Sequence, residues 1–214
     1  LGFGRDHPAS AHLIARLGNG SAVTETIAVT PRQWQLENLP TLPRVAQPSA
    51  EFLARRPGEL AQIEAARKLM SSQTGWRQRF IWPARGRISG VFGSQRIYAG
   101  EPGVPHNGVD VAGGAGTPVY APADGVVVLA ATSPFTLEGN LLMIDHGMGL
   151  SSAFLHLSRI DVAVGDVIRQ GQPLGAIGMT GRATGPHLHW GMRWLDQRID
   201  PALVAGPMAG VPAP

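Results

Sequence analysis

Val126-Val-Val-Leu-Ala130 begins a series of short apolar runs that decides the fold of this chain. Leu141-Leu-Met-Ile144 and Ser151-Ser-Ala-Phe-Leu155 follow it, and turns rich in glycine and proline separate the runs. Short apolar runs bounded by turn residues are typical of β-strands. No convincing helical pattern occurs between residues 80 and 204, so we predict a mainly β fold built on an antiparallel sheet.

Upstream of these runs, the chain is expected to form a small β-module. Ser21-Ala-Val-Thr-Glu-Thr-Ile-Ala-Val29 follows the turn signal Gly18-Asn-Gly20, a pattern typical of a β-hairpin. A single hairpin is too small for an independent sheet. We therefore predict a partial β-module over residues 1–43 that leans on its neighbour.

A proline-rich linker and an amphipathic helix are predicted over residues 44–78. The helix is expected within Glu59–Met70, where Leu60, Ile63 and Met70 share one face opposite the charged residues. A β-domain over residues 79–206 and a flexible tail over 207–214 complete the predicted domain organisation.

The composition excludes several classes of protein. No run approaches the ~20 apolar residues of a membrane helix, so no membrane span is expected. The absence of cysteine excludes disulfides and thiolate metal ligands. The 18 basic residues, of which only Lys68 is lysine, are scattered and not interleaved with aromatic residues, so no nucleic-acid partner is expected.

Two histidine clusters in the β-domain have the chemistry of metal ligands. In His106-Asn-Gly-Val-Asp110, an extended backbone would place the imidazole and the carboxylate on one face, with room for an ion over Gly108. His187-Leu-His189 places two imidazoles on one face of a strand. Two histidines, one carboxylate and an open fourth position make up a hydrolytic zinc site. An iron facial triad has the same composition, but hydrolysis suits zinc better, and the spacing leaves open whether His187 is a ligand.

His156 is a candidate to act beside the metal. In Ser152-Ala-Phe-Leu-His-Leu157, strand alternation would place His156 with Phe154 on the polar face, opposite the flanking leucines. An imidazole there can hydrogen-bond a reacting water or an oxyanion. Three other histidines are not assigned to the site: His7, His12 and His146, the last interpreted as a turn residue.

Together these runs resemble the LytM/lysostaphin family of zinc peptidases. The family motifs His-x-x-x-Asp, His-Leu-Ser and Thr-Gly-x-His-x-His are matched by His106–Asp110, His156-Leu-Ser158 and Thr184-Gly-Pro-His-Leu-His189. The resemblance covers residues 80 to about 204. Further matching runs are Ile88-Ser-Gly-Val-Phe-Gly93, Thr117-Pro-Val-Tyr-Ala-Pro122, Gly165-Asp-Val-Ile-Arg-Gln-Gly171 and Asp200-Pro201.

The resemblance implies a twisted sheet that lines a groove, open at both ends, with zinc at its floor. It implies that His106, Asp110 and His189 bind zinc. It also implies that His156 and His187 are catalytic and stay off the metal.

Three residues near these motifs concern the substrate. Tyr98 is a candidate hydrogen-bond donor to the oxyanion or a candidate substrate contact. The alternative is that Tyr98 has only a structural role. Ser152 and Phe154 stand where many relatives have threonine and tyrosine. We expect this difference to affect a hydrogen bond at the rim of the groove, and not the metal.

The function implied by the resemblance is zinc-dependent hydrolysis of peptide cross-links in bacterial peptidoglycan. The partners would be the peptide stems, with the D-Ala–meso-diaminopimelate bond favoured over polyglycine bridges because the N-terminal part resembles Gram-negative members. A regulatory protein is a further partner, of unknown identity. The chain begins Leu1-Gly-Phe without a signal peptide, so we expect a processed or trimmed fragment in the periplasm or outside the cell.

Two rival functions have to be weighed against hydrolysis. A catalytically silent peptidoglycan-binding or amidase-activating module would have the same fold, but such modules typically lack the metal ligands that this chain keeps. Biotinyl and lipoyl carrier domains share similar β-hairpins and need a lysine at a hairpin tip. The only lysine is Lys68, in the predicted helix, which excludes a carrier domain.

Overall fold

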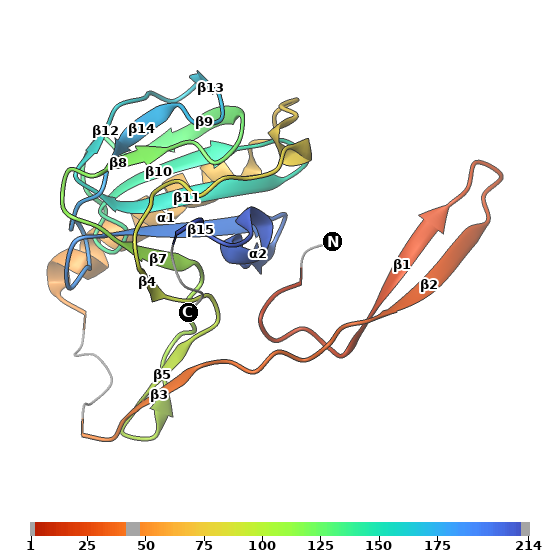
Figure 1. Cartoon of the computed structure of the whole chain (residues 1–214), viewed down its shortest axis with the longest axis horizontal. Coiled ribbons are helices and arrows are strands. Elements are labelled where there is room, and N and C mark those ends of the chain that lie inside the picture. The colour runs from red at the N-terminus through yellow and green to blue at the C-terminus, as the bar shows by residue number, and fades with distance from the viewer. Residues whose placement is uncertain (1–2, 42–47, 211–214) are drawn as a thin grey trace.

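The computed structural model describes residues 3–41 and 48–210, and its main feature is an eight-stranded antiparallel sheet (Figure 1). The strand order is β13-β9-β10-β11-β15-β7-β4, with β16 paired to β15. This confirms the predicted mainly β, antiparallel fold. The strands are β4 (Ile88–Gly90), β7 (Val109–Ala112), β9 (Gly125–Ala130), β10 (Asn140–Asp145), β11 (Leu150–Leu157), β13 (Val167–Ile168), β15 (His187–Trp194) and β16 (Gln197–Ile199).

A second, three-stranded sheet covers one face of the first and encloses the main core. Its order is β12-β14-β8, and Val119 and Leu174 from this sheet pack with Leu188 and Trp190 from β15. All four side chains are fully buried or nearly so. The strands are β8 (Pro118–Tyr120), β12 (Arg159–Ile160) and β14 (Pro173–Ala176).

Side-chain alternation along β15 separates the core from the functional face. Leu188, Trp190 and Met192 point into the main core, as expected for Leu188. His187 and His189, at the intervening positions, therefore lie on the opposite face of the sheet. This face is not covered by the three-stranded sheet, so it remains available for a site.

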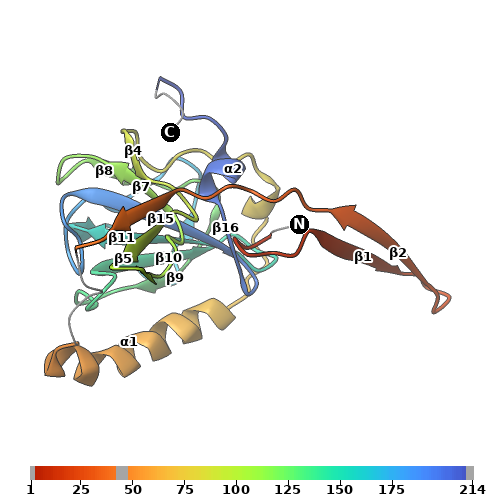
Figure 2. The ribbon, with the colours of Figure 1, turned by 90° about the horizontal axis from the view of Figure 1, so that it is seen from below.

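Helix α1 (Ala50–Lys68) packs on this same face, over β9, β10 and β11. Ile63 and Ala66 of the helix form a second apolar cluster with Leu141, Met143 and Phe135. Figure 2 shows the helix running along one side of the β-domain. Because Ala153 and Leu155 of β11 border this cluster and pair with β15, the helix stands next to the histidines and forms a side wall.

This helix differs from the predicted one in its limits and in the face that it buries. The helix begins nine residues before Glu59, because the Ser49 hydroxyl accepts a hydrogen bond from the backbone N–H of Phe52, and it continues through Pro57.

Leu60 and Met70 are exposed, and only Ile63 of the predicted apolar face is buried. Glu59 is buried instead, since its carboxylate accepts hydrogen bonds from the backbone N–H and the hydroxyl of Thr136.

The N-terminal part forms the expected hairpin, β1 (Ser10–Arg16) and β2 (Ala22–Ala28), which projects away from the β-domain (Figure 1). Downstream, β3 (Leu36–Leu39) pairs in parallel with β5 (Gln95–Tyr98), and β5 also pairs with β6 (Glu101–Pro102). The β-module thus leans on its neighbour through β3. Residues 42–47, where the predicted β-module ends and the predicted linker begins, lie outside the described residues.

Two features at the C-terminal end differ from expectation. A short helix, α2 (Pro201–Ala205), occurs where no helix was predicted, because the Asp200 carboxylate caps it by accepting a hydrogen bond from the N–H of Ala202. The predicted tail starts too early, since Met208 is buried in the main core. Residues 211–214 of that tail lie outside the described residues.

Among the helices described, none has the length and apolarity needed to cross a membrane.

His146 is a buried structural residue directly behind the functional face. Its Nδ1–H donates to the carbonyl of Asp124 at 2.7 Å, and the Ser152 hydroxyl lies 2.9 Å from its Nε2. The indole N–H of Trp190 donates to the same hydroxyl oxygen at 3.2 Å. This network ties β10, β11 and β15 together in the core. It is consistent with leaving His146 out of the site, but the residue is core rather than an open turn.

Burial lowers the pKa of His146 to about 4, and this shift predicts how stability depends on pH. The unfolded chain takes up the proton first, near the ordinary value of 6.5. The contribution of neutral His146 to the free energy of unfolding is therefore complete above pH 6.5. It is lost as the pH falls toward 4, which lowers the free energy of unfolding by about 3 kcal/mol. We expect the free energy of unfolding, measured with urea in the presence of a chelator, to decline accordingly between pH 7 and pH 4.

His146→Gln provides the control for this prediction, because it removes the titrating group and keeps a side chain that can hydrogen-bond. The variant is expected to be less stable at pH 7 and to have a shallower pH dependence. Equal slopes in both proteins would show that His146 is not the group responsible.

Candidate metal centre

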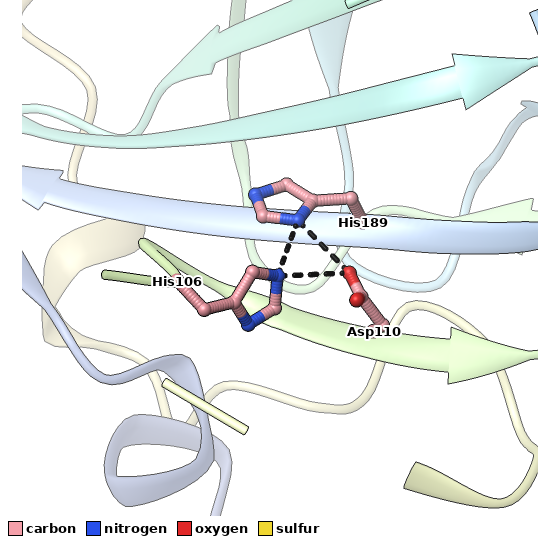
Figure 3. Close-up of side chains that lie close together, drawn as sticks. All are labelled: His106, Asp110 and His189. Carbon is pink, nitrogen blue, oxygen red and sulfur yellow. Dashed lines mark hydrogen bonds and ion pairs between the residues drawn. The ribbon is translucent and has the colours of Figure 1, made fainter. Parts of the chain in front are cut away.

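Three residues that are far apart in the sequence converge on the functional face (Figure 3). Asp110 and His189 are directly opposite each other on the paired strands β7 and β15, and His106 lies just before β7. The Asp110 Oδ1 atom is 2.9 Å from His189 Nδ1 and 3.1 Å from His106 Nε2. The two imidazole nitrogens are 3.0 Å apart. The sheet register thus brings together the three residues that the sequence analysis expected to bind a metal.

Glycines on two neighbouring segments make room for this cluster. A Cβ atom at Gly108 would lie 2.5 Å from the Trp190 carbonyl oxygen and 2.7 Å from His189 Nε2. At Gly90 of β4, a Cβ atom would lie 2.4 Å from Asp110 Oδ2. Both contacts are too close for any side chain. Gly108 therefore allows the approach of His189, and does not itself provide the space for the ion that was predicted over it.

The side chains of the cluster turn their ligand atoms toward its centre. A carbonyl oxygen can only accept, so His106 donates its Nδ1–H to Val91, at 3.1 Å, and its Nε2 faces Asp110. Burial would lower the pKa of His106, but the hydrogen bond to Asp110 outweighs it and raises that pKa, so a cation would have to displace the proton on Nε2. Burial would raise the pKa of Asp110, but hydrogen bonds and charge interactions with His106 and His189 outweigh it and hold the pKa well below its ordinary value. The centre thus offers a carboxylate and imidazole nitrogens to a cation.

These three ligand atoms fit zinc. With bonds of about 2.0–2.1 Å, a tetrahedral zinc ion separates its ligand atoms by roughly 3.3 Å. The three observed separations of 2.9–3.1 Å are within a few tenths of an ångström of that spacing. Two nitrogens and one oxygen from protein side chains leave a fourth position for water or substrate, as in catalytic zinc sites.

His156 and His187 lie beside the three clustered residues. The ring centroids of His156 and His187 are 4.8 Å apart, and His156 lies 6.4 Å from His189. His187 Nε2 is 3.8 Å from Asp110 Oδ1. This longer distance leaves His187 outside the group of three close ligand atoms, and so favours the reading in which His189 is the metal-binding member of the pair.

Both of these histidines are oriented by backbone carbonyls. His156 donates its Nδ1–H to Thr180 and His187 donates its Nδ1–H to Gly185, each at 2.8 Å. In the neutral rings, Nε2 then carries the lone pair and can accept a proton. Burial, followed by repulsion from His187 and His189, lowers the pKa of His156 and favours that neutral form. The two carbonyl acceptors were not predicted, because an acceptor on the main chain leaves no signal in residue type.

The backbone of His156, rather than strand alternation, directs its side chain to the site. Phe154 and Leu157 are both buried in the main core, and Leu155 borders the cluster under α1. The prediction that His156 shares a face with Phe154 was therefore wrong. His156 has a φ of +64°, a left-handed conformation that costs energy for a non-glycine residue and interrupts the alternation.

A clamp between α1 and the loop before β10 supports this conformation. The backbone N–H of His156 donates to the carbonyl of Glu138 at 2.8 Å. The Glu138 carboxylate in turn pairs with both terminal nitrogens of Arg56, at 2.6 and 2.9 Å. Bidentate pairs of this kind fix geometry as well as charge. The helix thus helps to hold His156, a role that its sequence did not indicate.

The residues expected at the rim of the groove are placed elsewhere. Ser152 and Phe154 are buried in the interior, so their difference from relatives changes core packing and not a rim hydrogen bond. Tyr98 lies on β5, and its ring packs against Gly103. A role for Tyr98 at the oxyanion therefore remains a prediction without support from these contacts.

The part of the chain that holds these residues is similar to a known family of peptidases. The model of peptidase family M23 matches residues 104–201, a segment that includes the clustered residues and both neighbouring histidines. Peptidoglycan DD-endopeptidase ShyA of Vibrio cholerae is 44% identical over 114 residues, covering 53% of this chain and 26% of ShyA. The chain thus spans about a quarter of the length of this curated relative.

Solved structures extend the similarity over nearly the whole chain. The crystal structure of a peptidase M23 from Pseudomonas aeruginosa has a TM-score of 0.73 and 34% identity, covering 94% of this chain and 75% of that one. A zinc containing peptidase from Vibrio cholerae has a TM-score of 0.55 and 20% identity, covering 94% and 79%. At this lower identity the likeness concerns the fold alone.

Proposed function

The chain belongs to peptidase family M23, and from this premise we propose that it hydrolyses peptide cross-links of bacterial peptidoglycan as a zinc-dependent endopeptidase. The observation that carries the proposal is the convergence of His106, Asp110 and His189 beside two further histidines with free Nε2 atoms. The name of ShyA, a peptidoglycan DD-endopeptidase, supports the substrate class.

Zinc is the cofactor of this family, and we propose that His106 Nε2, Asp110 Oδ1 and His189 Nδ1 hold it. When bound, zinc supplies a Lewis acid for the scissile carbonyl and lowers the pKa of a water molecule from about 15.7 toward about 7. The carboxylate contributes the negative charge of the site. The glycines at positions 90 and 108 keep it free of other side chains.

His156 and His187 are proposed as the catalytic residues. With Nδ1–H held by backbone carbonyls, each can accept a proton at Nε2 and return it to the leaving amine. In its protonated form, either ring can also donate a hydrogen bond to the oxyanion. Their positions at the edge of the cluster suit these steps, because both rings lie next to the clustered residues without being part of them.

We further propose the D-Ala–meso-diaminopimelate bond as the cross-link that is cut. The support is analogy with ShyA and the Gram-negative appearance of the N-terminal part, and it does not come from contacts in the site. Since peptidoglycan lies outside the cytoplasm, the proposal places the chain in the periplasm or outside the cell.

Removal of the metal is expected to abolish this activity. Purified sacculi would be incubated with the zinc-loaded protein, with chelator-treated protein and with chelator-treated protein after zinc is restored. Mass spectrometry of the soluble muropeptides should show cleaved cross-links in the first and third samples only. Equal solubilisation by the chelated protein would contradict a metal-dependent mechanism. Binding to sacculi without cleavage in any sample would instead indicate a silent wall-binding module.

A further inference from the structure

A second polar cluster lies further along the same face of β15. Since residues at every second position share a face, Arg193 points to the same side as His187 and His189. Arg193 lies four positions beyond His189 along the strand, a distance of roughly 13 Å. Arg198 of β16 is paired directly with Arg193. Two arginines therefore face each other across adjacent strands, an arrangement that is destabilising unless an anion lies between them.

Helix α1 adds a third guanidinium to this pair. Arg67 is in the last turn of the helix, and Figure 2 shows this end of α1 close to the turn between β15 and β16. Burial lowers the pKa of Arg67, and repulsion from Arg193 and Arg198 lowers it further. The pKa of Arg198 is likewise lowered by burial and by Arg193. Three positive charges from the wall and the floor of the functional face thus act on one another.

Among the described residues, carboxylates neutralise this cluster only weakly, and Arg193 Nη2 donates to the backbone carbonyl of Asp196 at 3.1 Å. Glu64 lies 3.9 Å from the Arg67 guanidinium, and its side chain is largely exposed. Asp196 lies 3.9 Å from Arg193 and is fully exposed. Within residues 3–41 and 48–210, the buried Nε atom of Arg193 has no hydrogen-bond partner. A buried donor without a partner is costly, so this cluster has unused capacity for an acceptor.

A hollow connects the arginines with the metal centre. It has a volume of about 630 Å³, and its lining includes Arg193, Arg198 and His106 together with residues 4–8 of the N-terminal segment. A peptide that occupies the metal centre could therefore continue toward the arginines. At about 3.3–3.6 Å per residue, some four extended residues would span the distance.

We propose that Arg67, Arg193 and Arg198 form a subsite for a free carboxylate of the substrate peptide, about four residues from the bond that is cut. Guanidinium groups match carboxylates in charge and in planar geometry. Stem peptides carry such carboxylates at acidic residues and at their C-termini. This inference rests on the proposed function for the identity of the peptide, but not for the presence of an anion site.

The test compares Arg198→Gln with the wild-type protein on two forms of one substrate. One form is a cross-linked muropeptide dimer with free carboxylates, and the other is the same dimer with its carboxylates converted to amides. We expect kcat/KM of the wild type to fall about tenfold on amidation, and Arg198→Gln to lose about tenfold on the free acid and little on the amide. A loss that is the same on both substrates, or no loss at all, would overturn the subsite.

Arg159→Gln is the matched control, because Arg159 pairs with Asp161 on the exposed strand β12 and has no part in the functional face. It should behave as wild type on both substrates. Since Arg198→Gln relieves a repulsion, its melting temperature should be no lower than that of the wild type. This excludes misfolding as the cause of lost activity.

A binding measurement separates this inference from the proposed function. The free-acid dimer would be titrated into chelator-treated protein while the arginine Nε–H resonances are followed by NMR. The Arg193 resonance should shift with the acid and not with the amide. A shift without cleavage by the zinc-loaded protein would support the carboxylate site and contradict the peptidase. Cleavage of both dimers without a shift of the Arg193 resonance would contradict the carboxylate site and support the peptidase.

Discussion

Asp110→Ala is expected to lose zinc and, with it, essentially all cleavage of peptidoglycan. Asp110 Oδ1 lies 2.9–3.1 Å from both imidazole nitrogens of the cluster and supplies the only negative charge among the three proposed ligands. Without that charge, two neutral imidazoles would have to hold a divalent cation. We expect turnover to fall more than about a thousandfold, because both the Lewis acid and the lowered pKa of water are lost.

Elemental analysis after dialysis would show about one zinc ion per chain in the wild type and close to none in the variant. Asp161→Ala, which removes an exposed carboxylate from the same domain, is the control and should keep both zinc and activity. Circular dichroism in the presence of a chelator would establish that Asp110→Ala is folded. Full zinc content in the variant would show that the metal centre has been assigned to the wrong residues.

The clustered residues could be proposed from their chemistry, whereas their meeting depends on contacts that spacing does not specify. Backbone hydrogen bonds with Gly93 and Ser94 hold His106 before β7, and its ring thereby comes within 3.1 Å of Asp110. The meeting of Asp110 with His189 depends on the pairing of β7 with β15, which spacing alone does not specify. The two clusters were joined into one predicted site on their ligand chemistry, and the family resemblance then assigned His189 rather than His187 to the metal. The same dependence explains why residue spacing could not decide between His187 and His189.

Other errors arose where tertiary structure overrides a local pattern. His156 departs from strand alternation because its left-handed φ, supported by a hydrogen bond to the Glu138 carbonyl, interrupts the period of the strand. The apolar face of α1 was misjudged because Glu59 is buried by hydrogen bonds to a loop 77 residues away. Neither partner is near in sequence, so neither contact could be read from composition or periodicity.

The position of α1 has a consequence for function that the sequence did not reveal. From the sequence, this helix was expected only as part of the region 44–78 that follows the β-module. In the structure it packs beside the histidines, clamps the loop that holds His156 through Arg56, and ends close to the turn between β15 and β16. A segment outside the matched family region thus contributes to the wall of the site. Differences between family members in this helix are therefore expected to alter substrate contacts while leaving the metal unchanged.

The two histidines beside the cluster should behave differently from the ligands when they are replaced. His156→Ala and His187→Ala are each expected to keep about one zinc ion per chain and to lose turnover by at least about a hundredfold. The reason is that each ring offers Nε2 to the reacting groups, while its Nδ1–H is held by a backbone carbonyl away from the three proposed ligands. Zinc content and kcat, measured on the same preparations, would separate this outcome from a loss of metal.

His156 requires a second variant, because its left-handed backbone is itself a source of strain. Asparagine tolerates this conformation better than alanine, so His156→Asn should fold as well as the wild type and still lack a group able to accept the proton. If only the alanine variant were inactive, the defect would be one of backbone conformation.

His12→Ala, in the exposed hairpin β1–β2, is the control and should leave zinc and kcat unchanged. Full activity in His187→Ala or His156→Asn would show that the replaced histidine takes no part in proton transfer.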